Sequence, residues 1–122
     1  MGKLKKTFCF DLDNVICETK KTNYKKSKPV YQSIKILNEL YKRGSKIIIF
    51  TGRHFGKCNG NLKKIIKTDQ GLTKNQLQKW GVKYHRLFFG KPVFDIYLDD
   101  KNFEFKTNWP KQFRKKYLIN KK

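Results

Sequence analysis

The chain has 122 residues, of which 38% are hydrophobic, and this is enough for one domain with a modest core. Thirty Lys and Arg against nine Asp and Glu give a formal net charge of +21, a balance that often accompanies a polyanionic partner such as nucleic acid. Only four of the thirty are Arg, the residue type that reads bases and grips phosphate with two hydrogen bonds. We therefore expect a solvated, Lys-biased surface, with nucleic acid as a less favoured partner.

Three cysteines, Cys9, Cys17 and Cys58, follow no metal-ligand spacing and suggest neither a disulfide framework nor a zinc site. The apolar run near the N-terminus is broken by Asp11 and Asp13 before it reaches the length of a signal sequence or a membrane span. These features predict a soluble, cytoplasmic protein without a membrane partner.

The first half of the chain predicts a strand, a helix and a strand. Residues 7–10 are apolar without alternation, as in a strand buried on both faces, and a polar, Lys-rich connection follows over residues 14–28. Apolar residues then recur at helical spacing between Pro29 and a stop at Gly44. Residues 46–50 form the clearest strand, so the three elements predict a right-handed parallel unit.

The second half is less regular. Within residues 54–71 a short helical turn is predicted at Leu62, Ile65 and Ile66, whereas Thr73 and Gln76 form a capping box for a short helix that ends at Gly81. Residues 86–89 and 94–98 predict a third and a fourth strand. For the basic tail, residues 104–122, a docked helix and a partly disordered end both remain open.

Polar residues follow three of the predicted strands at their carboxyl ends. Because such ends meet at one edge of a parallel sheet, we expect these residues to share a crevice. Strand alternation also turns Asp11 and Asp13 toward the same side. Four gathered carboxylates would repel one another without a cation, and oxygen ligands with no neighbouring His or Cys pair favour Mg²⁺. The expected metal ligands are Asp11, Asp13, Asp99 and Asp100. A hydroxyl and a lysine nearby suggest a substrate that carries phosphate.

Four motifs in this order resemble those of the haloacid dehalogenase-like (HAD) superfamily of phosphohydrolases. They are Asp11-Leu12-Asp13-Asn14-Val15, the strand ending in Thr51-Gly52-Arg53, Lys91-Pro92, and the strand ending in Asp99-Asp100. The pattern from Gly81 to Asp100 is similar to small HAD proteins connected with capsule or polysaccharide biosynthesis. The resemblance implies an α/β fold over residues 1–103, a three-layer, Rossmann-like parallel sheet with helices on both faces and no cap domain.

The resemblance also implies roles for single residues. Asp11 would be the nucleophile that forms an aspartyl-phosphate, and Asp13 the general acid and base. Thr51 would hydrogen-bond the transferred phosphoryl group, and Lys91 would pair with nucleophile and phosphate. The substrate- and phosphate-binding set is completed by Leu12, Asn14, Gly52 and Arg53.

Some of these assignments have alternatives. Lys83 is a weaker candidate for the phosphate lysine, and Arg53 could bind substrate or pair with an acid. Thr51 as a turn residue and Lys91 as a surface lysine are the simpler readings. Structural or solvent-facing roles are expected for His54 and His85.

Neither connection after the first two motifs, residues 14–28 and 54–71, has room for an inserted cap domain. An open site suits large substrates or closure by a second subunit in a homo-oligomer. The leading hypothesis is a Mg²⁺-dependent phosphomonoester hydrolase that acts on a phosphorylated sugar or related small metabolite. The alternatives are a phosphatase of nucleic-acid 3′ ends and a non-catalytic phosphate-binding protein of the same fold.

Overall fold

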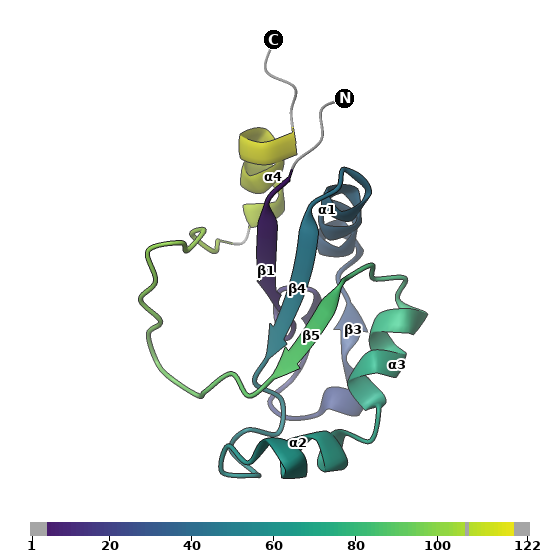
Figure 1. Ribbon diagram of the computed structural model, residues 1–122, viewed down its shortest axis with the longest axis vertical. Coiled ribbons are helices and arrows are strands. Elements are labelled where there is room, and N and C mark those ends of the chain that lie inside the picture. Colours follow the sequence, from purple (N-terminus) through teal and green to yellow (C-terminus); the bar gives the residue numbers. More distant parts are fainter. Residues whose placement is uncertain (1–4, 107, 119–122) are drawn as a thin grey trace.

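A three-stranded parallel sheet organises the chain in the computed structural model, which describes residues 5–106 and 108–118. Its strands are β1 (Thr7–Asp11), β4 (Lys46–Thr51) and β5 (Arg86–Phe89), in the order β1-β4-β5. The register pairs Asp11 with Phe50 and Thr51 with Phe89, so all three strands end at one edge, the lower edge in Figure 1. This confirms the α/β class and the parallel unit expected from sequence.

Helices flank the sheet and form its connections. They are α1 (Tyr31–Lys42), α2 (Leu62–Asp69), α3 (Leu72–Lys79), α4 (Trp109–Phe113) and the π-helical turn η2 (Arg114–Leu118). Between β1 and α1 lie the two-residue strands β2 (Cys17–Glu18) and β3 (Lys28–Pro29) and the 3₁₀ turn η1 (Tyr24–Lys26). No connection in the described ranges holds a separately packed cap, as expected. None of the described helices is long and apolar enough for a membrane span.

One face of the sheet is buried more deeply than the other. Phe10, Ile47 and Ile49 are buried in the core, whereas Cys9 is exposed and Ile48 is only partly buried. Apolar runs without alternation predict that both faces of the sheet are covered. Burial alternates instead, because α1 and α4 pack against the Phe10 side, where α4 contributes ring contacts.

The basic tail docks on this same side. Phe8 of β1 lies 5.4 Å, between ring centroids, from both Phe113 and Tyr117, and Trp109 is buried beside them. Residues 109–118 are therefore helical and pack against β1 through buried aromatic side chains. Of the two alternatives for the tail, this is the docked helix. Residues 119–122 of that tail lie outside the described residues.

The prediction of a fourth strand at residues 94–98 is wrong. These residues belong to a loop that runs from β5 to α4 away from the sheet, with Ile96 and Leu98 79% and 91% exposed (Figure 1). A parallel strand after β5 would have to start at the opposite edge of the sheet. Residues 90–93 span at most about 14 Å, less than the roughly 17 Å of a five-residue strand, and parallel crossovers need about a dozen residues or more.

The prediction that Thr73 and Gln76 form a capping box is also wrong. Helix α3 begins at Leu72, and its N-cap residue is Gly71, with φ of 80°, which makes no side-chain cap. Instead, the carboxylate of Asp69 accepts a hydrogen bond from the backbone N–H of Thr73 at 3.0 Å. The side chains of Thr73 and Gln76 are turned toward Arg53, so they serve the site described next.

Candidate active site

The carboxyl ends of the three strands bring most of the candidate residues together. Asp11 ends β1, Thr51 ends β4, and Lys91 follows β5 by two residues. The Lys91 N–H donates to the Thr51 carbonyl at 3.2 Å, and a Cβ at Gly52 would lie 2.9 Å from the Lys91 carbonyl oxygen. A glycine is therefore needed at position 52 for the Thr51 and Lys91 segments to approach so closely.

Asp11 and Lys91 form an ion pair at this edge. The Lys91 Nζ lies 3.2 Å from Asp11 Oδ2, and the backbone N–H of Leu12 donates to Asp11 Oδ1 at 2.8 Å. Burial raises the pKa of Asp11, and Lys91 opposes the rise. The side chain of Asp11 is still 37% exposed, so its carboxylate is both paired with a cation and open to a ligand.

Lys83, the alternative phosphate lysine, lies elsewhere. It is exposed and precedes β5, and its backbone N–H donates to Asn38 Oδ1 of α1 at 2.8 Å. That position is near the amino end of β5, opposite the edge where Asp11 lies. Lys91 is thus the lysine that the fold brings to the candidate site.

Asp13 is held by a buried arginine. Arg53 Nε lies 3.1 Å from both carboxylate oxygens of Asp13, and Nη2 lies 2.9 Å from Oδ1. The arginine side chain is 0% exposed and that of Asp13 is 21% exposed. Such a two-point contact fixes the plane of the carboxylate as well as its position.

The remaining donors of Arg53 are also occupied. Nη1 donates to Thr73 Oγ1 at 3.2 Å and to Gln76 Oε1 at 2.5 Å, and Nη2 donates to Ser27 Oγ at 3.1 Å. The ring centroid of Tyr24 lies 4.9 Å from the guanidinium carbon. Since a guanidinium has five N–H groups, none is left over for a phosphate in this arrangement. Of the two alternatives for Arg53, the structure shows the pairing with an acid.

The loop after β1 is a tight turn around Leu12. The Leu12 carbonyl accepts from the backbone N–H groups of Ile16 at 2.9 Å and Cys17 at 3.2 Å, and the Leu12 side chain is fully buried. Asn14 is exposed at the turn in the left-handed region, with φ of 67°, and its N–H donates to the Cys17 carbonyl at 2.6 Å. The N–H groups of Leu12 and Asn14, candidates for phosphate binding, are therefore both engaged within the chain.

Asp99 and Asp100 are not brought to the other carboxylates. Both are exposed on the loop between β5 and α4, where Asp99 Oδ1 accepts from the Lys101 N–H at 2.9 Å, a bond that lowers the pKa of Asp99. In the described part of the chain, no three His, Cys, Asp or Glu side chains gather as a metal site. Burial raises the pKa of the Cys9 thiol, Lys91 opposes the rise, and Asp11 and Asp99 add to it.

Sequence reasoning did not identify the polar residues that support Arg53. Ser27 lies in the Lys-rich connection, and Thr73 and Gln76 have the spacing of a helix-capping box. His54 Nε2 lies 2.9 Å from the buried Asp69 carboxylate, which agrees with the structural role expected for this histidine. Only tertiary packing brings these side chains together, so no local pattern signals them.

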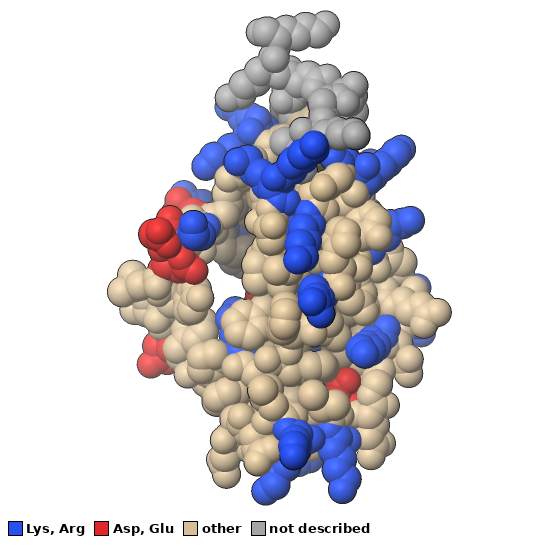
Figure 2. All heavy atoms as spheres, in the orientation of Figure 1, with Lys and Arg blue, Asp and Glu red and all other residues tan. Residues whose placement is uncertain are grey.

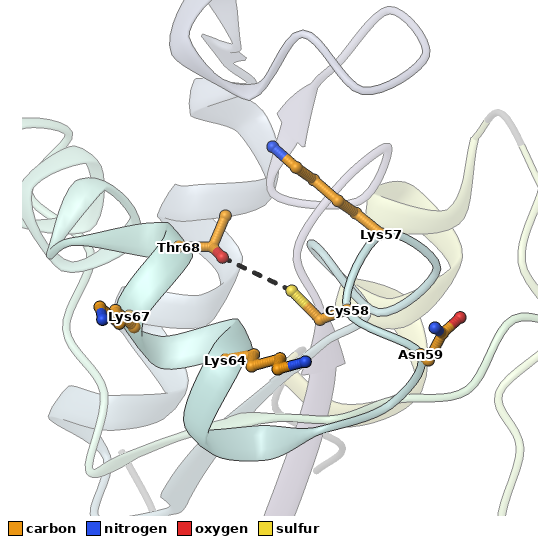
Figure 3. Close-up of a pocket in the computed structure, with 6 residues that line it drawn as sticks. All are labelled: Lys57, Cys58, Asn59, Lys64, Lys67 and Thr68. Atoms are coloured by element: carbon orange, nitrogen blue, oxygen red, sulfur yellow. Dashed lines mark hydrogen bonds between the residues drawn. The ribbon is translucent and has the colours of Figure 1, made fainter.

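The basic residues do not converge on one point. Figure 2 shows Lys and Arg side chains spread over the visible face. Near α2 a hollow of about 250 Å³ is lined by Lys57, Cys58, Asn59, Lys64, Lys67 and Thr68. In Figure 3 the three lysines of this hollow point in different directions, while Cys58 Sγ contacts Thr68 Oγ1 at 3.5 Å. The hollow therefore offers no focused anion site.

No protein-family model and no curated protein matches the chain. Among solved structures, it is similar to a structural-genomics target from Vibrio cholerae, with 25% identity and a TM-score of 0.75 over 93% of this chain and 98% of that one. It is also similar to a chain in the structure of the Pnkp1/Rnl/Hen1 complex, with 19% identity and a TM-score of 0.53 over 94% of this chain. A second structure, of the Pnkp1/Rnl/Hen1 RNA repair complex, gives 16% identity and a TM-score of 0.51. This chain spans 34% and 32% of those two longer chains. These similarities show a shared fold, a small α/β unit built on a parallel sheet.

Proposed function

We propose that the protein is a Mg²⁺-dependent phosphomonoester hydrolase of the HAD type that acts on a phosphorylated sugar or related small metabolite. The observation that carries the proposal is the Asp11 carboxylate, partly exposed at the end of β1 and 3.2 Å from the Lys91 ammonium. Asp13 lies two residues on, in the loop after β1. The order of the sequence motifs supports the assignment of roles, and the shared fold is compatible with it.

The reaction has two steps. A carboxylate oxygen of Asp11 attacks phosphorus as the bond to the leaving oxygen breaks, and Asp13 gives its proton to that oxygen. Water then attacks the aspartyl-phosphate, the bond from Asp11 to phosphorus breaks, and Asp13 takes the proton from the water. Lys91 offsets the negative charge of the phosphoryl group. The Thr51 hydroxyl, which accepts from the Arg53 N–H at 3.1 Å, keeps its own proton to donate to a phosphoryl oxygen.

The metal requires a contribution from the loop after β5. As described, the carboxylates at the sheet edge do not make a complete Mg²⁺ donor set, so Asp99 and Asp100 have to approach Asp11. The exposure of apolar residues of this loop, such as Leu98 at 91%, supports such an approach, because little packing holds the loop in place. When bound, the ion would neutralise phosphate charge.

This metal proposal has its own test. Mg²⁺ titrated into the protein should raise the midpoint of thermal unfolding, because a ligand that binds only the folded state stabilises it. Asp100→Asn should weaken the effect, and Glu104→Gln, on the same loop, should not. An unchanged midpoint in the wild type would argue against a resident Mg²⁺ ion.

A phosphatase of nucleic-acid 3′ ends is the second candidate. The net charge of +21 and the similarity to a chain of an RNA repair complex favour it. The divergent lysines around the hollow near α2 and the scarcity of Arg favour the small substrate.

A panel of phosphate esters separates the candidates. Phosphate release should be measured with sugar phosphates and with 3′-phosphorylated oligonucleotides, using Asp11→Asn as the control for contaminating activity. Higher kcat/KM on sugar phosphates supports the proposal. Activity confined to oligonucleotides, falling steeply with salt, supports the second candidate. Release from no substrate would favour a non-catalytic phosphate-binding protein.

A further inference from the structure

The contacts of Asp13 distinguish its two oxygens. Oδ1 lies 2.6 Å from Thr19 Oγ1, 2.9 Å from Arg53 Nη2 and 3.1 Å from Arg53 Nε, with the Cys17 thiol at 3.6 Å. The hydrogen bond recorded for Oδ2 is the one from Arg53 Nε at 3.1 Å. One oxygen is therefore surrounded by donors, while the other has capacity left for a further partner.

We propose that Arg53 is a positioning residue that fixes Oδ1 of Asp13 and leaves Oδ2 as the atom that exchanges the proton with leaving group and water. This inference rests on the proposed hydrolase function. It assigns Arg53 to the orientation of the acid and base, and not to the binding of substrate phosphate.

The directions of the hydrogen bonds around Oδ1 follow from the number of protons available. Oδ1 of Asp13 only accepts, both when the carboxylate is ionised and when its proton is on Oδ2, so the Thr19 hydroxyl donates to Oδ1. The only hydroxyl proton of Thr19 is then used, and Ser27 Oγ must donate to Thr19 Oγ1 across their 2.6 Å contact. Ser27 in turn accepts from Arg53 Nη2 at 3.1 Å. These groups form a closed ring in which every hydroxyl proton has one acceptor.

A second set of bonds fixes the far side of the guanidinium. The Thr73 hydroxyl donates to the Asp69 carboxylate at 2.7 Å, so its lone pair faces Arg53 Nη1. His54 Nε2 also meets Asp69, at 2.9 Å, and must carry a proton there because the carboxylate accepts. Gln76 accepts from Arg53 and donates to the Tyr24 carbonyl at 2.6 Å.

The guanidinium is thus bound to three separate segments, which are the loop after β1, the connection that contains η1, and α3. Because these segments hold the guanidinium in place, Arg53 cannot follow a rotation of the Asp13 carboxylate, and such a rotation would break the bonds of Asp13 to Arg53 and Thr19. A general acid fixed in this way presents the same oxygen at every turnover, and such orientation is a recognised part of catalytic efficiency.

The test compares two substrates whose leaving groups differ in how much they need protonation. Protonation by Asp13 matters more for phenyl phosphate than for p-nitrophenyl phosphate, because phenolate is the poorer leaving group. Arg53→Lys should lower kcat/KM for phenyl phosphate by at least about tenfold, and by no more than the ~10²–10⁴-fold that general acid catalysis contributes. The loss for p-nitrophenyl phosphate should be clearly smaller, and the inhibition constant of inorganic phosphate should not change.

Two further variants separate positioning from loss of folding. Ser27→Ala and Thr73→Val each remove one uncharged hydroxyl that accepts from Arg53. Each should give the same leaving-group dependence at smaller amplitude, with a cooperative unfolding transition retained. Combining Arg53→Lys with Asp13→Asn should cost no more than Asp13→Asn alone, since both act through one carboxylate.

The results have distinct meanings. Equal losses for both esters together with weaker inhibition by phosphate would show that Arg53 contacts the substrate, which overturns this inference and leaves the hydrolase proposal intact. Additive losses in the double variant would overturn it as well. No turnover of either ester by the wild type would refute the hydrolase proposal, and the inference would fall with it.

Discussion

Replacing Arg53 with methionine should destabilise the fold as well as impair chemistry. The side chain is 0% exposed, and its removal leaves Asp13, Thr73 and Gln76 without their charged partner. Removing one member of a buried ion pair costs about 3–5 kcal/mol. Asp13 keeps some contact with solvent, being 21% exposed, so the lower end, about 3 kcal/mol, applies here.

A loss of about 3 kcal/mol is a large part of the ~5–15 kcal/mol that stabilises a typical domain. For a chain of this length it lowers the midpoint of thermal unfolding by roughly 10–20 °C. Urea unfolding followed by tryptophan fluorescence gives the free energy directly, because Trp80 and Trp109 are both buried. The matched control is Arg86→Met, an exposed arginine of β5, which should change stability by no more than about 0.5 kcal/mol. A loss below about 1 kcal/mol for Arg53→Met would refute the view that this network holds the three segments together.

Three other outcomes are expected. Asp11→Asn should abolish turnover without lowering the free energy of unfolding. Burial raises the pKa of Asp11, so folding disfavours the ionised carboxylate. Any gain in stability of the variant over the wild type should therefore appear as the pH rises through that pKa. Lys91→Met should move the acid limb of the kcat/KM profile to higher pH, because Lys91 opposes the rise in the pKa of Asp11; an unmoved limb would contradict the pairing. Gly52→Ala should lower both activity and unfolding midpoint, whereas Gly56→Ala, where an added Cβ meets nothing within 4 Å, should preserve activity.

The sheet edge was predictable because its signals are local. Strands that end on Asp11 and Thr51 are marked by short apolar runs, and a parallel sheet brings such ends together whatever the rest of the chain does. The register of β1, β4 and β5 confirms that arrangement, and Lys91 reaches Asp11 because Gly52 admits its backbone.

The fourth strand and the helix cap were predicted wrongly because the outcome depends on how far the chain can extend between strands and on tertiary packing. The apolar pattern of residues 94–98 is a strand signal, yet the preceding connection is too short to return them to the start of a parallel strand. Thr73 and Gln76 have the spacing of a capping box, but Arg53, about twenty residues earlier, competes for the same side chains. A buried guanidinium needs acceptors for five N–H groups, and leaving them unpaired costs more free energy than the loss of a helix cap, which is about 1 kcal/mol.

The most direct test of the central claim compares wild-type protein with Asp11→Asn on p-nitrophenyl phosphate in the presence of Mg²⁺. The wild type should release nitrophenolate and phosphate and should carry a transient phosphoryl group on the peptide that contains Asp11, detectable by mass spectrometry after acid quenching. The variant should release neither product and carry no phosphoryl group. Turnover by Asp11→Asn at the wild-type rate, or a phosphoryl group on another residue, would contradict the assignment of Asp11 as the nucleophile.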